Sequence, residues 1–130
     1  MIYLDASALI TLISGRRYAD ELRSFLAAQP AMPMATSTLG LIETVRTMDR
    51  IGDYPGLMHD LVGQFTEILL TEEVRDAAAA LPGRLRTLDA IHVASAQILG
   101  DAFAVLLTYD KRMLEVARAV GLRAEAPGLA

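Results

Sequence analysis

Short apolar runs alternate with segments of helical periodicity along the 130 residues of this chain. Apolar residues that recur at spacings of three and four are typical of amphipathic helices, and short unbroken apolar runs are typical of buried strands. The predicted strands cover residues 2–4, 31–35, 67–70, 102–109 and 122–126. The predicted helices cover residues 7–14, 18–29, 39–50, 56–65, 72–81, 85–99 and 111–120. The chain is therefore expected to alternate strand and helix.

The predicted strands lack a polar alternation, so both of their faces are expected to be covered. Short apolar strands separated by helices are typical of a parallel sheet with helices on each side. The sequence thus predicts an α/β fold of three layers, α/β/α, around a short, mostly parallel central sheet of four to five strands. Because no linker or repeat interrupts the pattern, we expect a single domain over residues 1–130.

Two aspartates stand directly after predicted strands. Asp5 follows the run at 2–4, and Asp110 follows the run at 102–109. Each could simply cap the next helix, which is worth about 1 kcal/mol. However, ligands of parallel α/β proteins bind at the carboxyl ends of the strands. Two carboxylates at one end of a sheet therefore raise the expectation of a functional site there.

Two further acids lie in predicted helices, and each also has an ordinary structural explanation. Glu43 borders the buried face of its helix and could pair with Arg46 three residues later, for a few tenths of a kcal/mol. Asp89 lies in the first turn of its helix, where the helix dipole favours a negative charge. Its neighbours on the same helix face do not form an obviously solvated surface, which keeps a functional role open.

Carboxylates that gather at one site resist ionising together unless a cation lies between them. The chain has no cysteine, so a metal would be held by oxygen or imidazole. Oxygen ligands favour Mg²⁺ or Mn²⁺, and such an ion can activate water for displacement at phosphorus. This hypothesis requires four acids far apart in sequence to converge. If they do, Asp89→Asn should raise the melting temperature in EDTA by removing one repelling charge.

Composition narrows the class of protein. The net charge of -4 argues against a broad basic face that neutralises nucleic-acid phosphates. The longest apolar stretches, such as AFAVLL at 102–107, fall far short of the roughly 18 residues that a membrane span needs. We therefore predict a cytoplasmic protein with no membrane partner, which the absence of cysteine suits.

Four segments, MIYLDASAL, TSTLGLIE, RTLDAIHVASA and LLTYDKRMLEVARAVGL, occur in this order along the chain. They closely resemble the motifs of PIN-domain nucleases, specifically the VapC-type toxins of bacterial toxin–antitoxin pairs. The resemblance covers nearly the whole chain and implies a PIN-like fold. It also implies that Asp5, Glu43, Asp89 and Asp110 converge at the carboxyl ends of the sheet, hold Mg²⁺ or Mn²⁺ and form the catalytic site.

The same resemblance implies endoribonuclease activity, in which a metal-activated water attacks an RNA phosphodiester without a covalent enzyme intermediate. It further implies a homodimer, and a cognate antitoxin whose tail enters the active-site groove. Ser7 and Thr108 match hydroxyl positions that support the site in that family. Some PIN proteins carry a further acid shortly after the position of Asp110. Lys111 and Arg112 follow Asp110 here, which places a second tightly held metal in doubt.

Lys111 and Arg112 are candidates for RNA phosphate contacts, because they lie beside the expected site in an otherwise acidic chain. Ordinary solvated helix residues are the equally weighted alternative. His92, one turn after Asp89, could act as a base. A partly buried histidine bonded to a neighbour is the favoured interpretation, and the family needs no histidine base.

Other functions fit the sequence less well. A phosphoaspartate enzyme of the haloacid-dehalogenase kind needs a second acid two residues after the first, where this chain has Ser7. A response-regulator receiver needs an aspartate after its third strand, where this chain has Thr71. The remaining alternative is a PIN-like module that binds RNA or protein without cutting. Such a module gains nothing from clustered negative charge facing phosphate, which favours the nuclease.

Overall fold

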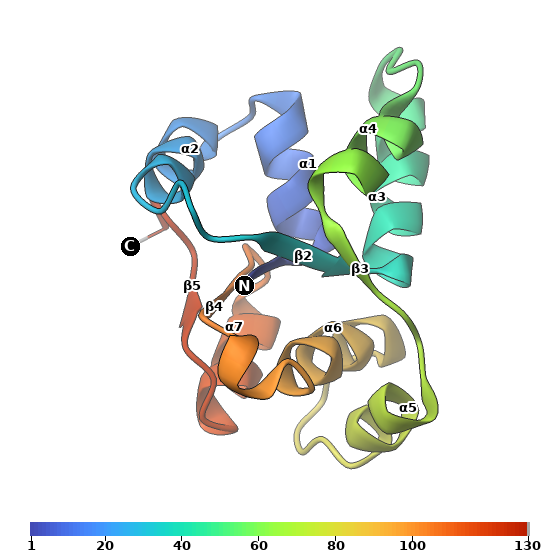
Figure 1. Cartoon of the computed structure of the whole chain (residues 1–130), viewed down its shortest axis with the longest axis vertical. Coiled ribbons are helices and arrows are strands. Elements are labelled where there is room, and N and C mark those ends of the chain that lie inside the picture. The colour runs from blue at the N-terminus through green and yellow to red at the C-terminus, as the bar shows by residue number, and fades with distance from the viewer. Residues whose placement is uncertain (130) are drawn as a thin grey trace.

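The computed structural model describes residues 1–129 and contains a five-stranded sheet (Figure 1). Its strands are β1 (Ile2–Leu4), β2 (Met34–Ser37), β3 (Thr66–Ile68), β4 (Val105–Leu107) and β5 (Ala124–Glu125). Their order across the sheet is β3-β2-β1-β4-β5, and every neighbouring pair is parallel. The predicted domain of 1–130 extends to Ala130, which lies outside the described residues.

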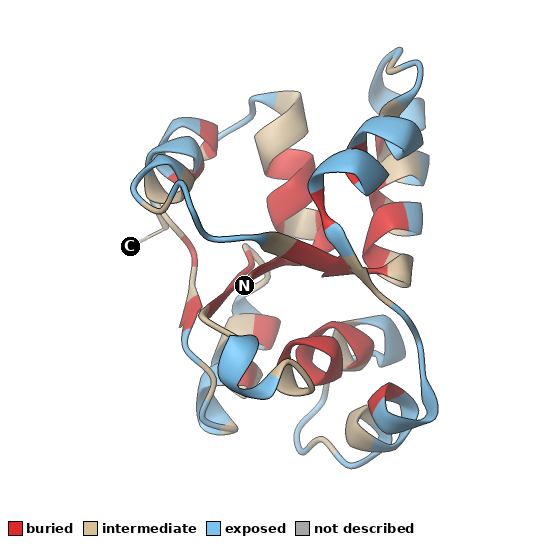
Figure 2. Ribbon diagram, in the orientation of Figure 1, coloured by how far each residue is buried: buried red, intermediate tan, exposed pale blue. Residues whose placement is uncertain are grey.

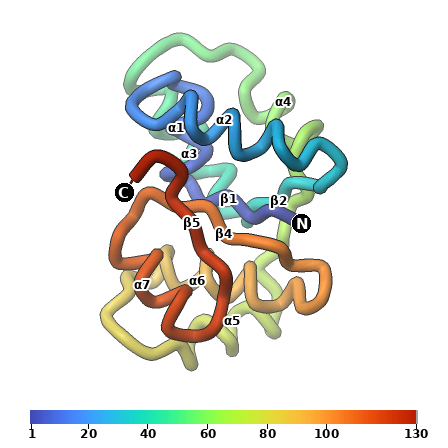
Figure 3. Tube along the Cα trace, turned by 90° about the vertical axis from the view of Figure 1, so that its left-hand side faces the viewer, coloured from blue at the N-terminus to red at the C-terminus, as the bar shows by residue number. Residues whose placement is uncertain are grey.

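Helices cover both faces of this sheet (Figure 3). One layer contains α1 (Ala6–Ser14), α2 (Ala19–Ala27), α3 (Thr38–Ile51) and α4 (Leu57–Gln64). The other contains α5 (Glu72–Ala79), α6 (Thr87–Gln97) and α7 (Lys111–Ala119), with the short 3-10 helix η1 (Gly100–Ala102) before β4. The α/β/α prediction is confirmed, with all five strands parallel. Over the described part of the chain, none of the helices combines the length and the apolar character needed to span a bilayer.

The central strand β1 is buried from both sides (Figure 2). Ile2 and Leu4 pack with side chains of the α1–α4 layer, whereas Tyr3 packs with side chains of α6 and α7. Alternate residues of a strand point to opposite faces, so an unbroken apolar run suits a strand covered twice. This arrangement fixes the end of β1, where Asp5 begins the next turn, between two packed layers.

The strands are shorter or differently placed than the apolar runs predicted. The predicted strand 31–35 begins only at Met34, after Pro33, which has no backbone N–H to donate. The run at 67–70 gives a strand that ends at Ile68, and the two leucines after it are 60% and 53% exposed. The run at 102–109 is a strand only over Val105–Leu107. Apolar residues in connecting segments therefore made the runs longer than the ladders.

Candidate metal centre

A pocket of about 200 Å³ opens where β1 and β4 end. Asp5 reaches it from the end of β1, and Asp110 reaches it from the turn after β4. Glu43 of α3 and Asp89 of α6 complete its acidic lining. The fold therefore brings the four acids predicted from sequence to one pocket, at the edge of the sheet where a ligand site was expected.

Asp5 is 2% exposed and has a hydrogen-bond partner on each carboxylate oxygen. Its Oδ1 accepts from Ser7 Oγ at 2.7 Å and from the Ala8 backbone N–H at 2.9 Å, so Asp5 also caps α1. Its Oδ2 accepts from Thr108 Oγ1 at 2.5 Å. Burial raises the pKa of Asp5 above its ordinary value, against the lowering effect of His92 and these hydrogen bonds. A cation in the pocket would offset that cost of burial.

The hydroxyls of Ser7 and Thr108 join the ends of β1 and β4. Besides donating to Asp5, Ser7 Oγ accepts from the Tyr109 N–H at 2.9 Å. Thr108 Oγ1 likewise accepts from the Asp110 N–H at 3.1 Å. Because each hydroxyl is both donor and acceptor, the two side chains hold the backbone before Asp110 against the Asp5 carboxylate.

Asp110 and Asp89 each have one oxygen engaged within the protein. Asp110 Oδ1 accepts the backbone N–H groups of Arg112 and Met113 at 2.9 and 3.1 Å, which caps α7. Asp89 Oδ2 lies 3.3 Å from Arg86 Nε, in a pair whose arginine side chain is 78% exposed. Exposed ion pairs contribute little net stability, so a divalent ion would displace Arg86 at small cost.

Glu43 is held by a buried histidine. His92 is 1% exposed, and its Nε2 lies 3.1 Å from Glu43 Oε1. Its Nδ1 lies 2.7 Å from the Tyr3 hydroxyl. A Cβ at Gly40 would lie 3.0 Å from His92 Cε1 and 2.4 Å from Thr36 Oγ1, so the glycine allows α3 to approach the imidazole. The sequence favoured a partly buried histidine with one neighbour, and the structure has a fully buried one with two.

The donor set suits a hard divalent cation, because it consists of carboxylates without thiolate. Within residues 1–129, however, no three His, Asp or Glu side chains stand close enough together to hold an ion as they are arranged. The four acids share the pocket, but their oxygens do not yet converge. An ion would have to replace Arg86 at Asp89 and draw the side chains inward by rotation. The residues therefore fit Mg²⁺ or Mn²⁺ after side-chain rearrangement.

Sequence reasoning missed two arginines at this site. Arg86 and Arg16 both line the acidic pocket. Arg86 also lines an adjoining pocket of about 510 Å³, together with Lys111 and Arg112. Its position three residues before Asp89 was the available signal. Arg16 gave none, because its place depends on hydrogen bonds back to α1 that only the folded chain reveals.

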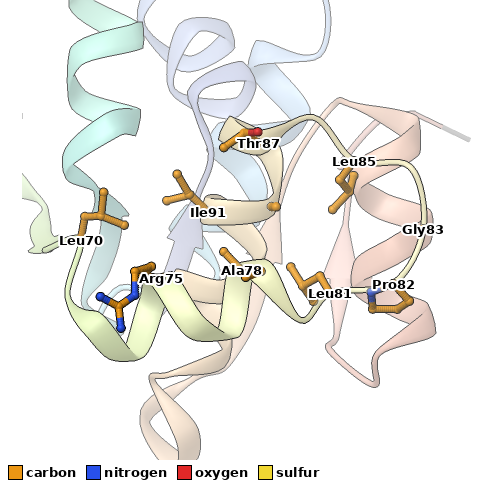
Figure 4. A pocket seen from close by; sticks show the side chains of 11 residues that line it. Leu70, Arg75, Ala78, Leu81, Pro82, Gly83, Leu85, Thr87 and Ile91 are labelled. Carbon is orange, nitrogen blue, oxygen red and sulfur yellow. The ribbon is translucent and has the colours of Figure 1, made fainter.

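A separate pocket of about 450 Å³ lies between α5 and α6 and is mainly apolar (Figure 4). Leu70, Leu81, Leu85 and Ile91 line it, and Arg75 is the charged residue among the described side chains around it. Because carboxylates are absent from its described lining, this pocket does not offer a cation site. The acidic pocket remains the candidate centre for chemistry.

Comparison with known proteins agrees with this geometry. Residues 2–119 match the model of the PIN domain family. Ribonuclease VapC47 of Mycobacterium tuberculosis is 39% identical over 134 residues, covering 98% of each chain. A toxin–antitoxin complex from Klebsiella pneumoniae aligns with a TM-score of 0.70 and 25% identity, over 86% of this chain and 89% of that one. Mycobacterium tuberculosis VapC20, a toxin that cleaves the sarcin–ricin loop, aligns with a TM-score of 0.74 and 17% identity, over 98% of this chain and 100% of that one. The chain therefore belongs to the PIN-domain family and is a relative of the VapC ribonucleases.

Proposed function

We propose that this protein is a metal-dependent endoribonuclease that hydrolyses RNA phosphodiester bonds and acts as the toxin of a toxin–antitoxin pair. The observation that carries the proposal is the acidic pocket at the carboxyl ends of β1 and β4, which four carboxylates line. Relatives that share nearly the whole chain are named VapC ribonucleases, which supports RNA as the substrate.

We assign the catalytic and metal-ligating roles to Asp5, Glu43, Asp89 and Asp110, with Mg²⁺ or Mn²⁺ as the cofactor. A bound divalent ion would offset negative charge at the phosphate and make water more acidic. The protein itself supplies rigid positions for the ligands. Asp5 in particular is buried and hydrogen-bonded on both oxygens, so it loses little side-chain freedom on binding an ion. Ser7 and Thr108 are assigned supporting roles through those bonds.

RNA phosphates are proposed to bind in the adjoining pocket. Lys111, Arg112 and Arg86 line it beside Asp89 and Asp110. These cations concentrate positive charge next to the acidic pocket in a chain whose net charge is -4. When an ion occupies the acidic pocket, Arg86 is released from Asp89 and becomes available to phosphate. Such contacts would position the RNA backbone without reading its sequence.

The double variant Lys111→Ala/Arg112→Ala is expected to bind RNA more weakly. Each lost phosphate contact releases fewer counterions, so the slope of log affinity against log salt should become shallower by roughly one unit for the pair. Fluorescence anisotropy with labelled RNA over a salt series measures both quantities. Arg75→Ala, in the separate apolar pocket, is the control and should leave the slope unchanged. RNA affinity equal to that of the wild type would identify both residues as ordinary solvated helix residues.

A cognate antitoxin is the proposed protein partner. A solved toxin–antitoxin complex is among the similar structures, which supports this partner. We also propose a homodimer, as the family resemblance implies. Ile42, Leu70 and Leu88 are 42 to 53% exposed although they are large and apolar, which supports an apolar contact between copies. With RNA as its substrate, the protein is expected to act in the cytoplasm.

Cleavage of RNA by the purified protein tests the proposed function. The expected result is cleavage in Mg²⁺ that is lost in EDTA and in the Asp5→Asn variant. RNA binding without cleavage in any divalent metal would instead identify the non-cutting PIN-like binding module. The comparison of these two outcomes needs only the full chain and a labelled RNA.

A further inference from the structure

His92 joins the central strand to a proposed metal ligand. It lies on α6 and is 1% exposed. On one side its Nδ1 is 2.7 Å from the hydroxyl of Tyr3 on β1, and on the other its Nε2 is 3.1 Å from Oε1 of Glu43 on α3. The rings of Tyr3 and His92 meet edge to face, with centroids 5.8 Å apart. Three elements are thus linked by one buried imidazole.

The chemistry of the partners fixes the direction of both hydrogen bonds. An ionised carboxylate can only accept, so Nε2 must donate its N–H to Glu43 Oε1. In a neutral imidazole the other nitrogen then carries a lone pair, and the Tyr3 hydroxyl donates to Nδ1. Because both ring nitrogens are engaged within the protein, His92 does not act as a base toward water. The arrangement suits a residue that holds Glu43 in place.

We propose that His92 is a positioning residue for the metal centre, which holds Oε1 of Glu43 and leaves Oε2 to bind the ion, while Tyr3 fixes the imidazole tautomer. This inference rests on the proposed function, in which Glu43 is a ligand. A glutamate side chain has several free torsions, and its side chain here is 35% exposed. Without the bond from His92 it would lose more conformational entropy on binding an ion.

The position of His92 also couples two of the four acids. Asp89 lies one turn before His92 on the same helix, and both line the acidic pocket. The close approach of α3 at Gly40 brings Glu43 to the same imidazole. His92 therefore sets where Glu43 stands relative to Asp89. Hydrogen bonds that orient metal ligands commonly change metal affinity by about 10- to 100-fold when they are removed.

Titration with Mn²⁺ alone tests this role, because free Mn²⁺ is measured directly by electron paramagnetic resonance. His92→Leu, which removes the donor at similar size, should weaken Mn²⁺ binding at least about tenfold. Tyr3→Phe, which removes only a hydroxyl, should weaken it in the same direction. His92→Gln keeps an N–H donor near Nε2 and should restore most of the affinity lost in His92→Leu.

Ser95→Ala is the matched control. Ser95 lies one turn after His92 on α6 and is 1% exposed, but its hydroxyl donates to the Ile91 carbonyl and does not reach Glu43. This variant should lose some thermal stability and bind Mn²⁺ like the wild type. A Ser95→Ala affinity as low as that of His92→Leu would reduce the effect to general loosening of α6 and overturn the proposal.

The remaining outcomes separate this inference from the proposed function. If the wild type binds Mn²⁺ and cleaves RNA but His92→Leu binds Mn²⁺ equally well, the inference is wrong and the function stands. If His92→Leu does not fold, Tyr3→Phe decides the question, and an unchanged affinity in that variant overturns the inference. If the wild type neither binds Mn²⁺ nor cleaves RNA, the proposed function fails and the inference falls with it.

Discussion

Asp5→Asn is expected to lower the rate of RNA cleavage in Mg²⁺ by more than about 100-fold. Loss of a residue that only orients a ligand commonly costs about 10- to 100-fold, and loss of a ligand charge should cost more. Asparagine has nearly the same shape as aspartate and is an equally good helix cap. Its amide oxygen can still accept from the Ala8 N–H, so α1 should keep its start. The change therefore removes a charge and little else.

The measurement is the initial rate of cleavage of a labelled RNA, with the melting curve of each variant as a check on folding. Asp20→Asn is the control, because the Asp20 side chain is 98% exposed on α2 and pairs only with Arg23 among the described residues. It should cleave RNA like the wild type. Wild-type cleavage by Asp5→Asn would show that the metal site has been assigned to the wrong residues.

The same Asp5→Asn variant should be more stable than the wild type when metal is removed with EDTA at neutral pH. Burial raises the pKa of Asp5 above its ordinary value of 3.8, so the folded state binds this proton more tightly than the unfolded state does. The wild type therefore loses stability as the pH rises above about 4, and the asparagine variant is spared that loss. Each kcal/mol gained corresponds to roughly 4 °C in melting temperature for a domain of this size.

Thermal melts in EDTA across the range from pH 4 to 8 measure this effect. The difference in melting temperature should widen as the pH rises and should narrow when Mg²⁺ is added, because the ion stabilises only the folded wild type. Asp89→Asn should give a smaller gain, since Arg86 already lies against the Asp89 carboxylate. A wild type that is more stable than Asp5→Asn in EDTA at neutral pH would contradict the account of a buried, uncompensated charge.

The layered fold was predictable because strand burial leaves a direct mark on the sequence. Ile2, Tyr3 and Leu4 carry no polar alternation, and the structure covers both sides of β1. The ends of strands were less predictable, because an apolar side chain does not reveal whether its backbone joins a ladder. Leu69 and Leu70 extended an apparent strand and are instead exposed after β3.

The candidate site divides in the same way. Asp5 and Asp110 could be found from their positions after strands, since that position alone suggests the edge where ligands bind. Glu43 and Asp89 lie within helices, where local pattern cannot distinguish a surface acid from a site acid, and the family resemblance was needed. Tyr3 looked like an ordinary core residue, because its hydroxyl meets His92 only after β1 and α6 pack together.

Crystals soaked in Mn²⁺ test the central claim most directly, because anomalous scattering locates the ion without reference to activity. The account predicts a Mn²⁺ peak in the acidic pocket within bonding distance of Asp5, with Glu43, Asp89 and Asp110 turned toward it and Arg86 released from Asp89. A protein that cleaves RNA in Mn²⁺ but holds the ion elsewhere, or holds none in this pocket, would contradict it.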